Sequence, residues 1–319
     1  MNFGVIGCGY IAKKSFIPAI IESSNANLSM IYTRSSDKQK ILEKEFNCNV
    51  ELNLDNMLSS DQVDAVYIAT PPSTHVNYIL EAAKNKKHIL CEKPLTTNLD
   101  MAEKVIKICK KNNVALMEGF MYQFHPQHDF VKSIIKETVL GEPILFQANF
   151  GFPPMNENNY RYNANLGGGA LLDAGVYTLH SARKIFNKEP VNAYAIRNSY
   201  KDGVDISGSC MLDFGDNKSA FLSYGFDNYY QNNYSIWFNK GLLKVHRAFS
   251  IPNDMKAKIT INQNNKEEII EIDCCNQFLA QLEYFILNHN KKNITNNWIN
   301  DIKNQYILID SILKFDSNI

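Results

Sequence analysis

The chain has 319 residues, of which 45% are hydrophobic, so it is long for one domain and ordinary in composition for a globular protein. Lys and Arg together number 33, as do Asp and Glu, and this balance argues against nucleic acid or an acidic membrane as a partner. The seven cysteines form no C-x-x-C pattern, which argues against a zinc site or a disulfide framework. With no signal-peptide pattern and no stretch of about 18 apolar residues, we predict a cytoplasmic protein.

Residues 1–120 alternate short apolar runs with segments of helical spacing. Continuous apolar strands separated by helices predict a doubly wound parallel sheet, covered on both faces. Pro18 lies inside the first predicted helix and is expected to kink it or shift its register. The predicted strands are 2–6, 28–33, 65–70, 88–91 and 115–120, and the predicted helices are 10–22, 37–46, 74–84 and 98–111.

After residue 140, apolar side chains alternate at period two, which predicts an open, largely antiparallel sheet. The change of period near residue 120 divides the chain into an N-terminal domain of residues 1–120 and an α/β domain of residues 121–319. Hairpin turns are expected at 215–217, 239–241 and 262–265, and covering helices at 171–186, 276–287 and 298–315. The predicted strands are 144–152, 206–214, 220–226, 234–238, 241–247, 257–262 and 268–273.

The first predicted strand leads into a glycine turn, Gly7-Cys8-Gly9-Tyr10-Ile11-Ala12. Gly7 permits a tight turn, Gly9 lets the backbone approach a pyrophosphate, and Ala12 still allows close helix packing. The helix that begins near Tyr10 and Ile11 directs its N-terminus at the phosphates. Because this fingerprint follows a strand and opens a helix, we predict a dinucleotide site of the Rossmann kind rather than a plain strand–turn–helix.

The second strand ends in Thr33, Arg34 and Ser35, where an NAD site commonly carries an acid. A guanidinium and hydroxyls suit the 2′-phosphate of NADP, so we predict NADP, with NAD as the alternative cofactor. The competing interpretation is that Arg34 is a solvated loop residue and that Ser35 or Ser36 only caps the next helix.

Two further strand ends carry polar residues at the edge where such sheets bind ligands. Thr70, Pro71 and His75 follow the third strand, and we assign them to the cofactor, although His75 fits a structural role equally well. Glu92 and Lys93 follow the next strand. An unpaired ammonium is costly to bury, but in a crevice Lys93 can hydrogen-bond the nicotinamide ribose and hold a neighbouring phenol at a useful pKa. A surface Lys-Pro turn is the alternative.

A third stretch places polar residues on one helical face behind the glycines at 167–169. Asp173, Tyr177 and His180 stand at i, i+4 and i+7 of the following helical segment, and the glycines allow the backbone to approach a neighbour closely. Tyr177 can donate or accept the proton of a substrate hydroxyl. The alternatives are a core aromatic at Tyr177, a charge favoured by the helix start at Asp173 and a satisfied core histidine at His180.

These motifs, in this order, resemble the glucose–fructose oxidoreductase, inositol dehydrogenase and rhizopine-catabolism superfamily, Gfo/Idh/MocA. The resemblance covers essentially the whole chain. The segment Asn159-Tyr160-Arg161, together with Val176-Tyr177, looks most like the dihydrodiol and xylose dehydrogenase branch, and we expect Arg161 to contact the cofactor.

The resemblance implies a Rossmann domain followed by an α/β domain with an open sheet. It also implies that Lys93, Asp173 and the residue four beyond, here Tyr177, line the nicotinamide pocket. The sequence departs from the family pattern at Gln123, where arginine is common, and this departure affects the expected shape of a cofactor or substrate contact.

We therefore predict an NADP-dependent dehydrogenase or reductase of a secondary alcohol and its ketone, on a sugar, a sugar derivative or a cyclic polyol. Tyr177 moves the hydroxyl proton with help from Lys93, while Asp173 bonds the substrate or orients Tyr177 and His180 has a possible direct role. The rivals are a non-catalytic dinucleotide sensor, which would not need an intact lysine and tyrosine, and a glycosidase that uses tightly held NAD for transient oxidation.

The predicted C-terminal sheet has a face that is only partly polar. It carries Trp237, Tyr194 and Phe221 among smaller groups. Because an exposed apolar patch of this kind usually meets a partner, we expect a homodimer or a dimer of dimers through this face.

Overall fold

A computed structural model describes residues 1–316, apart from the side chains of 198–200 and 316. Contacts between residues divide the chain into two compact units. Unit 1 comprises residues 1–121 and 278–303, and unit 2 comprises residues 122–277 and the chain from 304 onward. The predicted domains, 1–120 and 121–319, stay a prediction. The grouping of 278–303 with the N-terminal segment could not be read from the period of the sequence.

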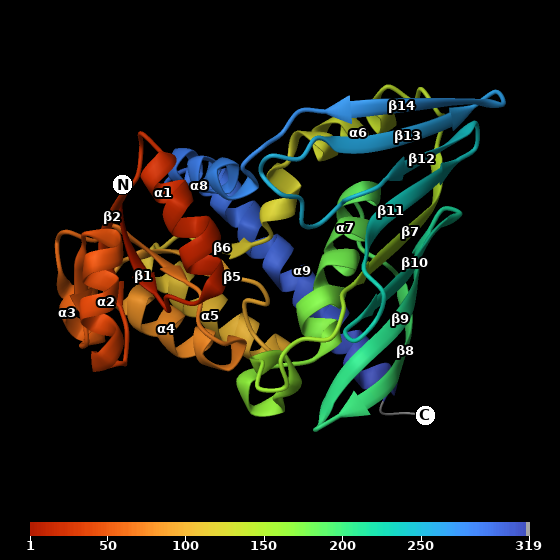
Figure 1. The fold of residues 1–319 in the computed structure, drawn as a ribbon. Helices are drawn as coiled ribbons and strands as arrows, with labels where there is room; N and C mark the ends of the chain where they lie inside the picture. The colour runs from red at the N-terminus through yellow and green to blue at the C-terminus, as the bar shows by residue number, and fades with distance from the viewer. Residues whose placement is uncertain (317–319) are drawn as a thin grey trace. The chain divides into compact units, whose positions relative to one another are not determined.

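Unit 1 is built on a six-stranded parallel sheet in the order β3-β2-β1-β4-β5-β6 (Figure 1). The order reverses between β1 and β4, which is where doubly wound sheets bind their ligands. The predicted fold class is confirmed. The sheet also contains a short strand, β3, that the sequence analysis did not predict. The strands are β1 (Asn2–Ile6), β2 (Asn27–Tyr32), β3 (Asn49–Glu51), β4 (Ala65–Ile68), β5 (His88–Glu92) and β6 (Leu116–Gly119).

The first helical segment of unit 1 changes register, as Pro18 predicts. A five-residue π-helix, η1 (Ala12–Phe16), leads directly into α1 (Ile17–Glu22), and the Ile17 N–H donates to the Ala12 carbonyl. Phe16, at the end of η1, stacks on Tyr67 of β4 with ring centroids 3.5 Å apart. The other helices of the N-terminal segment are α2 (Ser36–Phe46), α3 (Leu54–Ser59), α4 (Pro72–Lys84) and α5 (Leu99–Asn112).

Helix α8 (Gln277–Asn288) packs in unit 1, although we expected it to cover the C-terminal sheet. Its Phe285 contacts Phe3 of β1 with ring centroids 6.1 Å apart, and its Glu283 accepts hydrogen bonds from Ser23 and Asn25. An apolar helical face matches the face of any sheet, so the periodicity alone does not identify the surface that the helix covers.

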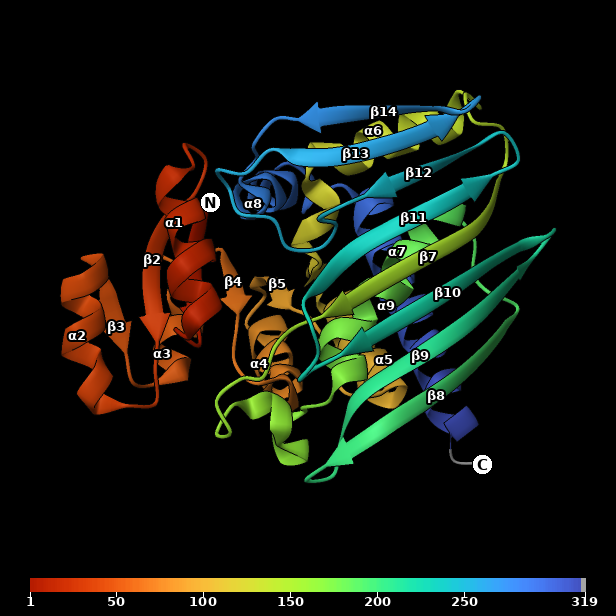
Figure 2. The same cartoon turned by 45° about the vertical axis from the view of Figure 1, so that its right-hand side comes forward.

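Unit 2 is built on an eight-stranded sheet in the order β14-β13-β12-β11-β7-β10-β9-β8 (Figure 2). Only β7 and β10 run parallel, so the predicted largely antiparallel sheet is confirmed. The predicted hairpins at 215–217 and 262–265 close at left-handed residues, among them Asp216, Asn217, Asn264 and Asn265. The strands are β7 (Pro143–Gly151), β8 (Asn192–Lys201), β9 (Val204–Gly215), β10 (Lys218–Gly225), β11 (Gln231–Phe238), β12 (Gly241–Val245), β13 (Ala257–Gln263) and β14 (Lys266–Ile272).

One face of this sheet is covered by α7 (Val176–Phe186) and by the C-terminal part of α9 (Lys292–Asp316), which lie on the same side (Figure 2). Phe186 packs on Phe214 of β9 with ring centroids 4.7 Å apart. No helix in the described part of the chain is both long and apolar enough to cross a membrane. The remaining helical segments are η2 (Met121–Phe124), α6 (Pro126–Lys136), η3 (Tyr160–Tyr162), η4 (Ala164–Leu166) and the π-helix η5 (Leu171–Gly175).

Candidate active site

The glycine turn after β1 has the shape that a pyrophosphate needs. Gly7 has φ +88°, and a Cβ there would lie 2.6 Å from Thr70 Cγ2, so a side chain does not fit. A Cβ at Gly9 would meet nothing within 4 Å, which means that open space lies in front of its backbone. The Lys13 N–H donates to the Gly9 carbonyl at 3.0 Å and closes the first helical turn. The N–H groups of a first turn have no partner inside the helix, so this turn fits a dinucleotide at Tyr10, Ile11 and Ala12.

The end of β2 presents a cation and a hydroxyl that the fold does not use as a helix cap. Arg34 is exposed, and Ser35 takes the N-cap position of α2 without a side-chain capping bond. The Ser35 N–H donates to Thr33 Oγ1 at 3.3 Å, and the Thr33 N–H donates to the carbonyl of Glu51. Because Ser35 makes no capping bond, its hydroxyl and the exposed guanidinium of Arg34 are available to contact an anionic group.

His75 links two of the predicted cofactor segments. Its Nδ1 lies 2.9 Å from the Pro94 carbonyl and its Nε2 lies 2.8 Å from the Thr70 carbonyl. The ring is buried, and burial lowers the pKa of His75. The Thr74 hydroxyl lies 2.8 Å from both Thr70 Oγ1 and the carbonyl oxygen of Pro71, so the end of β4 is held as well. The geometry favours a positioning role for His75 over the direct cofactor contact that we predicted.

Lys93 stands in a turn that is fixed on both sides. It follows β5 directly, is half-buried, and joins a cis proline. On one side, Glu92 Oε1 accepts from the Tyr67 hydroxyl at 2.5 Å. On the other, the Leu95 N–H donates to Glu118 Oε1 at 2.8 Å. Lys93 thus follows the carboxyl end of β5, the edge at which such sheets bind ligands, and its contact with a cofactor stays a prediction.

In unit 2, Asp173 and Arg161 form an ion pair. Arg161 Nε donates to Asp173 Oδ2 at 2.7 Å, and the exposed fractions of the two side chains are 23% and 7%. The guanidinium also lies over the ring of Tyr160, 4.8 Å from its centroid. Arg161 therefore belongs to the unit that carries Asp173, whereas the other predicted cofactor residues belong to unit 1.

The glycine loop before η5 approaches its own chain. A Cβ at Gly168 would lie 2.4 Å from the Arg161 carbonyl oxygen, and one at Gly169, which has φ +117°, would lie 2.5 Å from Asp205 Oδ1. The Gly169 N–H donates to the Arg161 carbonyl at 3.0 Å, and the Leu171 N–H donates to Asp205 Oδ2 at 2.8 Å. The glycines thus shape the start of the helical segment. Asp205 was missed by sequence reasoning because its contact joins segments far apart in the chain.

Tyr177 and His180 lie in an aromatic cluster on the first turns of α7. The Tyr177 ring packs edge-on against Phe150 and Tyr122, at centroid distances of 5.2 and 5.8 Å. Tyr122 Oη and His180 Nδ1 lie 2.7 Å apart, and both side chains are buried. The ring of His180 is thus hydrogen-bonded to Tyr122, and the choice of Tyr177 as the proton carrier stays a prediction. Tyr122 was not among the site residues predicted from the sequence.

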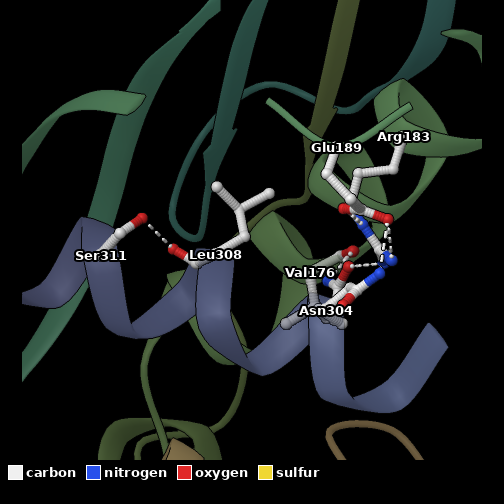
Figure 3. A network of polar contacts seen from close by, with 7 residues as sticks. Val176, Arg183, Glu189, Asn304, Leu308 and Ser311 are labelled. Carbon is white, nitrogen blue, oxygen red and sulfur yellow. Dashed lines mark hydrogen bonds and ion pairs between the residues drawn. The ribbon is translucent and has the colours of Figure 1, made fainter. Parts of the chain in front are cut away.

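A polar network fixes α7 to α9 (Figure 3). Arg183 donates to both carboxylate oxygens of Glu189, at 2.5 and 2.9 Å, and to Gln305 Oε1 at 2.8 Å. Gln305 Nε2 then donates to the Val176 carbonyl at 3.1 Å, directly before Tyr177 in the chain. The buried guanidinium is paired in this way, and the start of α7 is held in place.

The predicted site residues therefore gather in two groups. In unit 1, the cofactor residues lie after the carboxyl ends of β1, β2, β4 and β5, with Lys93 among them. In unit 2, Arg161, Asp173, Tyr177 and His180 lie on η3 or on the segment that runs from η5 into α7. Within the described residues, no group of three or more His, Cys, Asp or Glu side chains could hold a metal ion.

Two family models match the chain. Residues 1–120 match the oxidoreductase family with an NAD-binding Rossmann fold, and residues 128–244 match the GFO/IDH/MocA C-terminal domain. The dTDP-3,4-didehydro-2,6-dideoxy-α-D-glucose 3-reductase of Saccharopolyspora spinosa is 33% identical, over 82% of this chain and 80% of that protein. The D-xylose 1-dehydrogenase (NADP(+)) 2 of Haloferax volcanii is 29% identical, over 89% of this chain and 88% of that protein.

A solved structure with a similar fold is that of a 3-ketoreductase from Actinomadura kijaniata in complex with NADP and TDP-benzene. It is 30% identical, with a TM-score of 0.91, and the match covers 98% of this chain and 97% of that one. The resemblance stated from the sequence motifs is confirmed, and so is the reaction class that it implies. The chain belongs to the Gfo/Idh/MocA family and is an NAD(P)-dependent oxidoreductase.

Proposed function

We propose that the protein is an NADPH-dependent reductase that acts on the keto group of a sugar attached to a nucleoside diphosphate. The observation that carries this proposal is the likeness to 3-ketoreductases over nearly the whole chain, one of them solved with NADP and a TDP-linked ligand. Arg34 and Ser35 support the choice of NADPH, because they offer a cation and a hydroxyl where an NAD site commonly carries an acid.

The protein's own part in this reaction is to bind, to orient and to move one proton. Bound NADPH would supply the hydride. Tyr177 would give its phenolic proton to the carbonyl oxygen as that oxygen gains charge, and would then recover a proton from solvent. The ammonium of Lys93 would favour the phenolate left on Tyr177. Asp173 is held by Arg161, which suits it to orient Tyr177 or to accept a hydrogen bond from the substrate.

The test is a reduction assay with purified protein, NADPH and a set of dTDP-linked 3-keto and 4-keto deoxysugars. We expect NADPH absorbance to fall and the product mass to gain one hydride and one proton. Free keto sugars that lack the nucleotide should react far more slowly. If the nucleotide-linked ketones are inert while D-xylose is oxidised with NADP, the second candidate function, a sugar dehydrogenase like the Haloferax volcanii relative, replaces this one.

Two rival functions from other classes give different results in the same assay. A dinucleotide sensor would bind NADPH and turn over no substrate. A glycosidase that oxidises its substrate transiently would release free sugar from a glycoside without any net change in nicotinamide absorbance.

We further propose that the protein is cytoplasmic and forms a homodimer or a dimer of dimers through the open face of the eight-stranded sheet. Tyr194, Phe221 and Trp237 are exposed by 45%, 46% and 56%. Tyr194 pairs with Met211, which in turn pairs with Phe221, so these side chains form a continuous row across β8, β9 and β10. Such a row supports self-association through a two-fold axis.

A further inference from the structure

Arg161 is held rigidly beside the segment that carries Tyr177. Its Nε donates to Asp173 Oδ2 at 2.7 Å, its guanidinium lies over the Tyr160 ring, and its carbonyl accepts from the Gly169 N–H. Asp173 precedes Tyr177 by about one helical turn, at the junction of η5 and α7. Bonds on both sides of the residue fix the position of a permanent positive charge, because a guanidinium does not lose its proton in proteins.

The charge of Arg161 is coupled to the phenol of Tyr177. Burial alone would lower the pKa of Arg161, but Asp173 and the nearby phenols of Tyr160 and Tyr177 raise it above its ordinary value. Coulomb interactions act in both directions, so a phenol that favours the charged guanidinium is itself easier to ionise. This electrostatic relation agrees with the geometry of the ion pair.

The described rings that pack against Tyr177 are those of Tyr122, Phe150 and Phe249, and none of them carries a permanent charge. Phe150 and Phe249 are apolar, and the hydroxyl of Tyr122 is hydrogen-bonded to the ring of His180. His128 packs against Tyr122, and burial lowers the pKa of His128 to about 3, so it is neutral at neutral pH. In contrast to these ring neighbours, Arg161 and Asp173 carry permanent charges next to the segment that holds Tyr177.

We infer that Arg161 is a positioning residue that acts through Tyr177: its charge favours the phenolate, and the carboxylate of Asp173 opposes it. This assigns Arg161 to the acid–base group and not to the cofactor, where the sequence had suggested it. The consequence for turnover rests on the proposed function, whereas the effect on the ionisation of Tyr177 does not.

The role fits the proton balance of the reaction. When the Tyr177 O–H bond breaks and an O–H bond forms on the substrate, a negative charge remains on the phenol oxygen. A guanidinium can stabilise that charge without giving its own proton to either oxygen. The phenolate then takes a proton from solvent, and in the oxidising direction it accepts the proton of the substrate hydroxyl.

The test measures the ionisation of Tyr177 in the protein without cofactor or substrate. The near-ultraviolet absorbance of tyrosinate is followed against pH, and each protein is compared with its own Tyr177→Phe counterpart, so that the difference reports one phenol. Arg161→Met should raise the midpoint by roughly one pH unit or more, since an opposite charge has been removed. Asp173→Asn should lower it. A merely structural role does not produce opposite shifts.

Two further variants control the experiment. Arg247→Met removes another guanidinium that lies over a tyrosine ring, 5.2 Å from the centroid of Tyr230, and should leave the Tyr177 midpoint unchanged. Arg161→Lys keeps the positive charge and should shift the midpoint much less than Arg161→Met. If Arg161→Met does not fold, the lysine variant and Asp173→Asn still decide the outcome.

The inference is overturned if Arg161→Met leaves the midpoint unchanged, or if it and Asp173→Asn shift the midpoint in the same direction. An unchanged midpoint with weaker NADPH binding would return Arg161 to the cofactor. If the opposite shifts are found but no keto sugar is reduced, the inference stands and the proposed function fails. The two ideas are thus separated by one set of proteins.

Discussion

At the scale of single residues, we propose that Arg34 sets the cofactor preference. Replacing Arg34 by alanine should weaken NADPH binding by about 1.5–3 kcal/mol, the range for a hydrogen bond to a charged group. NADH, which has no 2′-phosphate, should bind as before. The measurement is fluorescence titration with both cofactors, and Lys40→Ala, at an exposed lysine on the following helix α2, serves as the control. Equal affinities of the native protein for NADPH and NADH would contradict the prediction.

We propose that the proton transfer uses Tyr177 and Lys93 together. Tyr177→Phe keeps the ring and removes the proton, and Lys93→Met keeps the length and removes the charge. Each should lower kcat by roughly 10²–10⁴-fold, the usual contribution of a general acid–base group, while NADPH binding is retained. Because the two side chains are proposed to act as one unit, the loss in the double variant should be far less than the product of the single losses.

The His180→Ala variant distinguishes two assignments on the same helix. If Tyr177→Phe keeps native turnover and His180→Ala abolishes it, the acid–base role belongs to His180 and its partner Tyr122. Sequence spacing could place these side chains on one helical face, but it could not show that the ring of His180 is already hydrogen-bonded, because Tyr122 lies 58 residues away.

At the scale of elements, the sequence predicted the regular parts of the fold well. Strands with buried apolar runs, such as β1 and β4, and hairpins with left-handed asparagines were identified because local chemistry determines them. The short polar strand β3 and the edge strand β8 were missed. β3 is three residues long, and β8 exposes Tyr194 and Ile196 while burying only a small alanine, Ala195, between them. Neither has a strong apolar alternation.

The role of the glycine loop before η5 could be predicted only in part. Three glycines in a row indicate a close approach, and the neighbours are Asp205 on β9 and the backbone of Tyr160 and Arg161. Gly169→Ala should therefore destabilise the protein by about 1–3 kcal/mol through backbone strain, with a further cost from the clash at Asp205 Oδ1. Chemical denaturation followed by circular dichroism would measure the change in the unfolding midpoint.

Gly203→Ala is the matched control for that change. Gly203 also has a positive φ, +82°, but a Cβ there would lie 3.8 Å from Ala164 Cβ, an ordinary contact. Its substitution should cost less than that of Gly169 and should leave turnover nearly unchanged. Equal destabilisation by the two substitutions would mean that the carboxylate of Asp205 moves away without cost and does not constrain the loop.

At the scale of the whole molecule, the chain order differs from the grouping in space. Residues 278–303 lie beyond every strand of the second sheet in the sequence and yet pack in unit 1. Side-chain contacts such as that of Phe285 with Phe3 produce this grouping. A local sequence pattern does not reveal them, because the two residues lie far apart in the chain. The chemistry of the predicted site is divided in the same way, with Lys93 in unit 1 and Tyr177 in unit 2. If Lys93 and Tyr177 act together as we propose, a fragment that contains only one unit should be inactive.

The open sheet face provides the last prediction at this scale. A row of exposed aromatic and aliphatic side chains across β8, β9 and β10 is costly to leave in water, and self-pairing would remove it from solvent. The native protein should elute as a homodimer or a dimer of dimers in size-exclusion chromatography with light scattering. Phe221→Asp and Trp237→Asp should shift it toward the monomer. Ile21→Asp, at an apolar residue on α1 that is exposed by 68%, should not. A native protein that is monomeric at micromolar concentration would rule out this interface.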